Sequence, residues 1–202
     1  LWQSRRAYAR PWGDSVLLVL PGVLDPVATK VGAWLAEKAA AAASPGERWV
    51  DMGCGTGVVG IALARAGAQV TSIDIDPDAV RNARANAALH QVPLEVVESD
   101  LFAAVPGRRW DRVVYNVPFW PGDPAGKPFG RAMFAGAGFE AIRAFAAAWP
   151  AHADEAWVVL SEYGGDFAGA RAALGPGRTI AREKVGGEWL TLVSLGPGAR
   201  SG

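Results

Sequence analysis

Hydrophobic and polar residues follow two different periods along the chain, and these periods alternate. Short apolar runs bounded by polar or glycine residues indicate buried strands, and apolar residues three and four positions apart indicate helices that cover a sheet. Strands are expected at residues 15–20, 48–51, 69–74, 94–98, 112–115, 156–161, 179–184 and 189–195. Helices are expected at residues 25–43, 58–66, 76–90, 138–149 and 167–174. This order predicts an α/β fold, with a mostly parallel sheet and helices on both of its faces.

The segments outside this alternation are turns and the two ends of the chain. Gly186-Gly187 separates the last two strands, which predicts a hairpin that adds an antiparallel strand. Residues 1–21 are interpreted as an N-terminal arm, irregular over residues 2–13, which either packs on the surface through its aromatic residues or covers the substrate site as a flap. Residues 196–202 are expected to form a frayed tail. No repeat or linker interrupts the sequence, so residues 1–202 are expected to be one domain with its core at residues 22–195.

Composition narrows the classes of function. The 202 residues include 20 basic and 20 acidic side chains, so the net charge is 0 and no basic excess indicates a nucleic-acid partner, although a local patch could serve. The lone cysteine, Cys54, excludes a disulfide within the chain, and the lack of a signal-peptide pattern adds to the expectation of a cytoplasmic protein. Apolar runs such as residues 16–20 are too short to span a bilayer, so no membrane association is expected.

Four chemically informative sites fall where predicted strands end. Residues 53–57 follow one strand, Asp74 closes the next, Asp100 follows the third and Asn116 closes the fourth. In a parallel sheet, ligands bind at the carboxyl ends of the strands. A carboxylate such as Asp74 can accept hydrogen bonds from both hydroxyls of a ribose. A second acid, Asp100, can accept one from an exocyclic adenine amine, which predicts a nucleoside site.

The glycine loop itself fits two ligands. Gly55, Gly57 and Gly60 satisfy the spacing of a dinucleotide-binding loop, so a nicotinamide dinucleotide is formally possible. The denser spacing of Gly53, Gly55 and Gly57, preceded by Asp51, favours a different ligand. An acid beside the turn repels a pyrophosphate, whereas it is tolerable or helpful beside a ligand that carries cationic groups.

Three segments together resemble the motifs of a known family. Val50-Asp51-Met52-Gly53-Cys54-Gly55-Thr56-Gly57 resembles motif I of the class I methyltransferases that depend on S-adenosyl-L-methionine (SAM). Ser72-Ile73-Asp74-Ile75-Asp76-Pro77 resembles their motif II, and Glu98-Ser99-Asp100-Leu101-Phe102 resembles motif III. The similarity covers about residues 22–195. It implies a Rossmann-like, seven-stranded, mostly parallel sheet in which the C-terminal hairpin inserts an antiparallel strand.

The resemblance also implies a cofactor site, with SAM as cofactor and S-adenosylhomocysteine (SAH) as product. Asp74 would bind the ribose and Asp100 the adenine, while the glycine loop would flank the methionine portion with Asp51 close by. Leu101 or Phe102 would pack on the base. Cys54 is interpreted as a small loop filler rather than a nucleophile, and no metal is expected. The residues implied to bind the cofactor are Asp51, Gly53, Cys54, Gly55, Thr56, Gly57, Asp74, Ile75, Asp100, Leu101, Phe102 and Asn116.

The stretch Val114-Tyr115-Asn116-Val117-Pro118-Phe119-Trp120 resembles the Asn-Pro-Pro-Tyr/Phe motif of enzymes that methylate planar nitrogens. Such nitrogens are poor nucleophiles because their lone pair is delocalised, and two acceptors placed on the two N–H groups orient that lone pair toward the methyl group. Asn116 Oδ1 and the carbonyl of Val117 can be these acceptors. Pro118 stiffens the turn, and Phe119 offers a flat apolar face. Val117 stands where the family has proline, and a proline-rich loop at residues 118–130 follows.

These residues predict a SAM-dependent methyltransferase with Asn116, Pro118 and Phe119 in the catalytic site. The leading hypothesis is transfer to an amide or amine nitrogen of a protein, as in the HemK-like glutamine methyltransferases, or of a small molecule. A second hypothesis is methylation of an RNA or DNA base at adenine-N6 or guanine-N2, with Lys127 and Arg131 on phosphate. A third is a non-catalytic SAM-binding partner subunit, and a more distant fourth is an NAD-dependent dehydrogenase.

Overall fold

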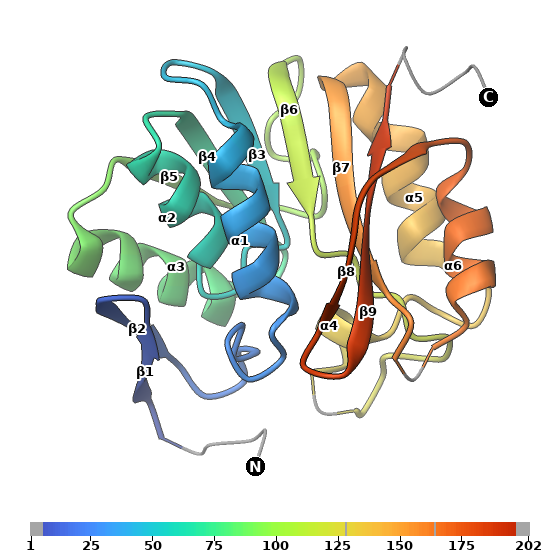
Figure 1. Cartoon of the computed structure of the whole chain (residues 1–202), viewed down its shortest axis with the longest axis horizontal. Coiled ribbons are helices and arrows are strands. Elements are labelled where there is room, and N and C mark those ends of the chain that lie inside the picture. The colour runs from blue at the N-terminus through green and yellow to red at the C-terminus, as the bar shows by residue number, and fades with distance from the viewer. Residues whose placement is uncertain (1–5, 128, 164, 197–202) are drawn as a thin grey trace. The chain divides into compact units, whose positions relative to one another are not determined.

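The computed structural model describes residues 6–127, 129–163 and 165–196 (Figure 1). The chain divides into two compact units, Leu1–Pro106 and Gly107–Gly202. The strands form a seven-stranded sheet with both parallel and antiparallel pairs, and a separate two-stranded sheet. The expected tail at residues 197–202 and the first five residues of the arm lie outside the described residues.

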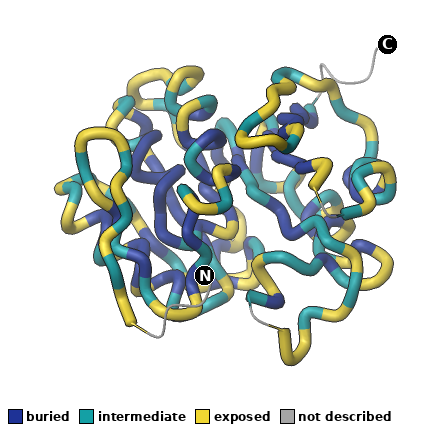
Figure 2. The backbone as a smooth tube through the Cα atoms, turned by 60° about the horizontal axis from the view of Figure 1, so that its bottom comes forward, coloured by how far each residue is buried: buried dark blue, intermediate teal, exposed yellow. Residues whose placement is uncertain are grey.

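The first unit contains a hairpin and three parallel strands of the large sheet. Its elements are β1 (Tyr8–Trp12), β2 (Ser15–Val19), α1 (Val31–Ala42), β3 (Arg48–Met52), α2 (Val58–Arg65), β4 (Gln69–Asp74), α3 (Pro77–His90) and β5 (Leu94–Glu98). The large-sheet strands lie in the order β5-β4-β3, and α1 packs against α2. Trp49, Val50 and Met52 of β3 are all buried. Figure 2 draws the buried parts of the backbone in dark blue. A strand that is buried on both faces reads as a continuous apolar run, which is why its position could be predicted.

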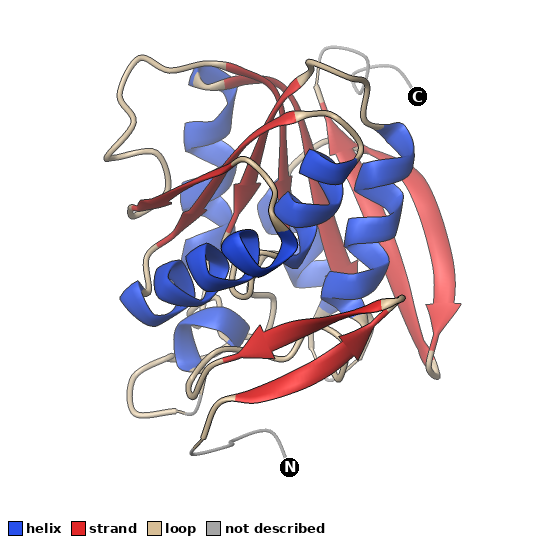
Figure 3. Ribbon diagram, turned by 90° about the vertical axis from the view of Figure 1, so that its left-hand side faces the viewer, coloured by secondary structure: helices blue, strands red, loops and turns tan. Residues whose placement is uncertain are grey.

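The N-terminal arm is a β-hairpin, and the expectation of an irregular segment over residues 2–13 is wrong where the structure describes it. β1 pairs antiparallel with β2, from Tyr8 opposite Val19 to Trp12 opposite Ser15 (Figure 3). Gly13 makes the turn at a φ of 59°, a left-handed conformation that favours glycine. Pro11 lies inside β1, and it is tolerated because a two-stranded sheet has only edge strands.

The first helix begins later than the predicted residue 25. Asp25 and Thr29 form a single turn, in which Thr29 N donates to Asp25 O at 3.0 Å. Lys30 then adopts a left-handed φ of 65°, which interrupts the helical path, and α1 starts at Val31. Asp25 therefore caps an isolated turn rather than the helix itself.

The second unit contains the other four strands of the large sheet. Its elements are β6 (Trp110–Tyr115), α4 (Gly130–Met133), α5 (Glu140–Ala148), a 3-10 turn (Trp149–Ala151), β7 (Ala153–Ser161), α6 (Phe167–Leu174), β8 (Arg178–Val185) and β9 (Glu188–Leu195). The order is β6-β7-β9-β8, and β9 is antiparallel to both β7 and β8. Gly186 and Gly187, at φ values of 58° and 99°, form the turn between β8 and β9, so the predicted hairpin is confirmed.

No helix among residues 6–127, 129–163 and 165–196 is long and apolar enough to cross a membrane. The longest helix of these ranges is α3, at 14 residues, and it carries several polar side chains.

Candidate functional site

The glycine loop that follows β3 has a backbone that only glycine adopts easily. Gly53, Gly55 and Gly57 have φ values of 63°, 53° and 81°. The loop is anchored by Cys54 N, which donates to Ile73 O at 3.0 Å, and it is tightened by Gly57 N, which donates to Cys54 O at 2.7 Å. The three glycines therefore shape a tight turn between β3 and α2.

The glycines of this region differ in what surrounds them. A Cβ at Gly60 would lie 2.4 Å from Ser72 Oγ, and one at Gly57 would lie 3.1 Å from Ala83 Cβ, so both allow close packing of α2. A Cβ at Gly55 would meet only Val23 Cγ1, at 4.0 Å. Gly55 thus faces space that is bounded by Val23 and has room beside it for a ligand, whereas Gly57 and Gly60 are closely packed.

Asp74, at the end of β4, is hydrogen-bonded directly to the glycine loop. Its Oδ2 accepts from Gly55 N at 2.9 Å, and its Oδ1 accepts from Asp76 N at 3.0 Å. Burial raises the pKa of this carboxyl above its ordinary value, although the two backbone hydrogen bonds act in the opposite direction. Each oxygen of Asp74 retains acceptor capacity beyond these bonds, since a carboxylate offers about four lone-pair positions.

The side chain of Asp51 is buried more deeply than that of a residue that faces a ligand. Its side chain is 3% exposed, and Oδ2 accepts from Gly60 N at 2.9 Å and from Ser72 Oγ at 3.4 Å. Burial raises the pKa of Asp51 to about 7, and the nearby charge of Asp74 adds to this effect. The geometry supports a role in holding the start of α2 against β3 and β4.

The segment after β5 is joined to the end of β4, since Ser99 N donates to Asp74 O at 2.9 Å. Asp100 is exposed, and Leu101 is half-buried with a left-handed φ of 47°. Phe102 is only 4% exposed, so Leu101 presents more of its side chain than Phe102 does. Hydrogen bonds through Asp74 therefore bring together the glycine loop and the two predicted acidic segments.

Three further predicted residues belong to the same unit. Cys54 is buried and packs against Val80 and Val96, and burial raises the pKa of its thiol, as befits a small loop filler. Thr56 is 2% exposed, and Oγ1 has no hydrogen-bond partner among the described residues. Ile75 remains 37% exposed beside Asp74.

The predicted acceptor segment follows β6 in the second unit. Asn116 and Phe119 are half-buried, whereas Val117 and Pro118 are buried. Val117 is only 1% exposed, so its branched side chain fills the interior where the family has proline. Phe119 packs against Gly165, where a Cβ would lie 3.4 Å from Phe119 Cδ2.

The long loop after this segment is held by backbone hydrogen bonds and ring contacts. Trp120 N donates to Met133 O at 2.9 Å, and Ala135 N donates to Trp120 O at 2.8 Å. The Trp120 and Phe134 rings meet edge to face at 5.6 Å, and Lys127 Nζ lies 3.8 Å from the centre of the Phe134 ring. Phe134 was not among the predicted site residues, because only tertiary pairing places it beside Trp120.

The strand–glycine loop–helix unit, the acids at two neighbouring strand ends and the inserted antiparallel strand define a Rossmann-like nucleoside-binding class. The family model of the methyltransferase small domain matches residues 30–140, which is more than half of the chain. The chain belongs to this family.

Similarity to individual proteins is local in sequence and broader in structure. A release factor glutamine methyltransferase of Koribacter versatilis is 40% identical over 77 residues, which are 36% of this chain and 28% of that protein. Ribosomal RNA small subunit methyltransferase C of Escherichia coli is 33% identical over 118 residues, which are 55% of this chain and 34% of that protein. The chain thus matches about a third or less of the length of these relatives. The solved T. thermophilus 16S rRNA N2 methyltransferase, in complex with AdoMet and guanosine, has a TM-score of 0.62 at 20% identity and covers 93% of this chain and 50% of that chain.

Family membership confirms the predicted Rossmann-like fold and SAM as the cofactor. The first unit fits this cofactor, because Gly55 faces space bounded by Val23 and Asp74 offers a fixed carboxylate beside it. A nicotinamide dinucleotide, the alternative ligand that the spacing of Gly55, Gly57 and Gly60 allowed, is therefore disfavoured.

Proposed function

We propose that this protein is a SAM-dependent N-methyltransferase that acts on a planar amide or amine nitrogen of a protein or a small molecule. The observation that carries the proposal is the stretch Asn116-Val117-Pro118-Phe119 at the end of β6 in a chain of the methyltransferase family. A glutamine-like amide is the favoured acceptor, in line with the glutamine methyltransferase among the relatives. We include both units in one catalytic domain, with its core at residues 22–195, and place the protein in the cytoplasm.

The first unit supplies the proposed cofactor site. Asp74 accepts hydrogen bonds from the ribose, and Asp100 accepts one from the adenine amine. Ile75, Leu101 and Phe102 belong to the apolar surroundings of the nucleoside, with Leu101 the more accessible of the last two. The loop Gly53, Cys54, Gly55, Thr56 and Gly57 flanks the methionine portion, while Asp51 supports the loop from inside.

The second unit supplies the proposed acceptor site. SAM provides a methyl group that is already activated on a sulfonium sulfur. Asn116 Oδ1 and the Val117 carbonyl accept the two N–H groups of the acceptor and so aim its lone pair in line with the methyl group. As the new N–C bond forms, the C–S bond breaks, its electron pair stays on sulfur, and the proton then leaves the nitrogen for solvent. Alignment of this kind accounts for roughly 7 to 11 kcal/mol of a barrier in favourable cases.

An RNA base is the second candidate acceptor, and two observations favour it. One relative is an rRNA methyltransferase. In addition, Lys127 Nζ and the Phe134 ring lie together on the loop that follows Asn116, and a cation beside an aromatic ring suits a stacked base. A non-catalytic SAM-binding partner subunit remains the third candidate, and Asn116 disfavours it because such a subunit has no need of an amine-orienting amide.

One experiment separates these candidates. The purified protein is incubated with SAM labelled in its methyl group and with a lysate of the native host, and label is then counted in protein, RNA and small molecules. Label in protein or small molecules supports the leading proposal, label in RNA supports the second, and no label above the protein-free control supports the partner subunit.

The variant Asn116→Ala tests the amide itself. We expect it to bind SAH as tightly as the unchanged protein and to lose transfer by at least about a hundredfold, the scale seen when a group that stabilises a transition state is removed. Full turnover by this variant would refute the orienting role of Asn116.

A further inference from the structure

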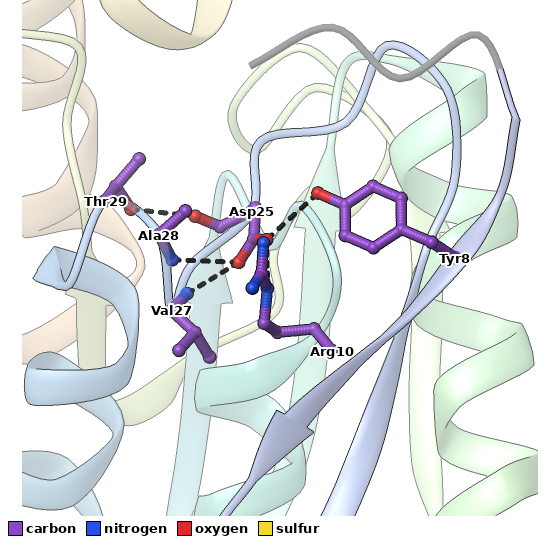
Figure 4. Close-up of polar contacts among 6 residues, drawn as sticks. All are labelled: Tyr8, Arg10, Asp25, Val27, Ala28 and Thr29. Carbon is purple, nitrogen blue, oxygen red and sulfur yellow. Dashed lines mark hydrogen bonds and ion pairs between the residues drawn. The ribbon is translucent and has the colours of Figure 1, made fainter. Parts of the chain in front are cut away.

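The hairpin β1–β2 is joined to the turn before α1 by one carboxylate. Asp25 Oδ2 accepts from Tyr8 Oη at 2.9 Å and from Arg10 Nε at 2.5 Å. Its Oδ1 accepts from Val27 N at 3.0 Å and from Ala28 N at 2.9 Å, as the close-up in Figure 4 shows. Asp25 is only 7% exposed. Tyr8, Arg10 and Asp25 together are called the latch.

The latch is a charged contact at neutral pH. Burial alone would raise the pKa of Asp25, but hydrogen bonds from Ala28, Tyr8 and Arg10 outweigh burial and lower that pKa below its ordinary value. Charge-assisted hydrogen bonds of this kind are shorter and stronger than neutral ones. The carboxylate therefore holds the hairpin and the turn in one geometry.

Residues 20–25 connect β2 to the turn at Asp25. Two buried asparagines of α3 hold the β2 end of this segment. Asn82 Oδ1 accepts from Leu20 N at 2.8 Å, and Asn86 Oδ1 accepts from Leu18 N at 2.8 Å. Asn86 Nδ2 also donates to Thr56 O at 2.9 Å, within the glycine loop. Both asparagines are fully buried, so β2 and the glycine loop share one rigid support.

Val23 lies between these two attachments. Its backbone N donates to Leu20 O at 3.2 Å, and its side chain is 6% exposed. Val23 Cγ1 is the atom that bounds the space over Gly55. A segment that is held by Asn82 at one end and by Asp25 at the other thus sets how far Val23 stands from the glycine loop.

We propose that Tyr8, Arg10 and Asp25 are positioning residues for the cofactor, which hold Val23 as the wall of the space over Gly55. The latch therefore sets the affinity for SAM and SAH through Val23, without touching the reacting atoms. This inference rests on the proposed role of the glycine loop in cofactor binding.

The test is calorimetric titration of variants of this 202-residue chain with SAH, together with KM for SAM, kcat and Tm. Tyr8→Phe removes a single oxygen, and Arg10→Leu removes the guanidinium. We expect each to weaken SAH binding roughly tenfold, the scale of one hydrogen bond to a charged group, and to raise KM more than it lowers kcat. Arg10→Lys keeps the positive charge and should recover part of the affinity.

Arg65→Leu is the matched control, because it loosens the hairpin at a different place. Arg65 Cζ lies 5.3 Å from the centre of the Trp12 ring, and Arg65 Nη2 is 2.8 Å from His90 Nδ1, so Arg65 fastens β1 to the ends of α2 and α3. We expect this variant to lower Tm while leaving the Kd for SAH unchanged. If the latch variants behave in the same way, the latch is merely structural and the proposal is overturned.

A double-mutant cycle tests whether the latch acts through Val23. Val23→Ala should weaken SAH binding, and combining it with Tyr8→Phe should cost less than the product of the two single effects, because the latch then has no wall to position. Multiplicative effects would refute the coupling. Failure of the unchanged protein to bind SAH would instead refute the proposed cofactor site, which keeps the two failures distinct.

Discussion

Asp51 offers a quantitative test of how the first unit is built. Its carboxyl is 3% exposed and is approached by Gly60 N at 2.9 Å and Ser72 Oγ at 3.4 Å. Burial raises its pKa from 3.8 to about 7. The variant Asp51→Asn keeps the size of the side chain and an oxygen that can accept from Gly60 N, but it removes the titration.

The sign of the effect follows from proton binding. Between pH 3.8 and about pH 7, the folded state holds the Asp51 proton more tightly than the unfolded state does. The free energy of unfolding therefore falls as pH rises through this window, by up to about 1.4 kcal/mol per pH unit, for a total of about 4 kcal/mol. This contribution is complete below pH 3.8 and is lost above about pH 7.

Urea denaturation followed by tryptophan fluorescence measures this dependence at pH 5, 6, 7 and 8, at constant ionic strength. Between pH 5 and pH 8, we expect the free energy of unfolding of Asp51→Asn to rise by about 2 to 3 kcal/mol relative to that of the unchanged protein. This difference should level off near pH 8. A difference that stays constant across this range would refute the argument from burial. Glu98→Gln, at an exposed position, removes the same charge, so equal slopes in the two variants would assign the effect to net charge instead.

Two further variants probe the neighbouring contacts. Gly60→Ala places a Cβ 2.4 Å from Ser72 Oγ, so we expect the free energy of unfolding to fall by about 1 to 3 kcal/mol. Adding Ser72→Ala should recover part of this loss, and no recovery would contradict the contact. Asp74→Ala removes the acceptor of Gly55 N, and we expect the affinity for SAH, measured by calorimetry, to weaken roughly tenfold or more. An unchanged Kd would show that Asp74 is not part of the cofactor site.

Much of the first unit could be predicted because its signals are local. Short runs rich in apolar residues marked β3 and β4. Asp76 with Pro77 marked the start of α3, where Asp76 Oδ1 does accept from Asp78 N. The same local signal at Asp25 misled, because its carboxylate serves both the turn and a hairpin that is distant along the chain. A cap pattern identifies the donors that a carboxylate satisfies nearby, but it does not tell whether a helix continues beyond them.

The parts that could not be predicted depend on contacts between segments far apart in sequence. Pro11 concealed β1, since a proline inside a run argues against a strand unless its partner is known. Residues 118–130 were predicted only as a long loop, because the backbone bonds between Trp120 and residues 133–135 leave no local pattern. Asn82 and Asn86 lie in a predicted helix, but no sequence signal marked them, and only the structure reveals that they are buried against β2.

Asp51 and Asp74 bond to the glycine-loop region, whereas Asp25 bonds to the hairpin and to its own turn, and these environments differ in a way that matters for binding a cation. Asp51 and Asp74 have raised pKa values because they are buried, whereas the latch lowers the pKa of Asp25. The latch therefore keeps its charge under mildly acidic conditions in which Asp51 is protonated. Because Asp51 and Asp74 are buried next to the loop, ionising either carboxyl costs stability. A ligand with a positive sulfonium would offset part of that cost, which is a physical reason for such a loop to favour SAM over an anionic pyrophosphate.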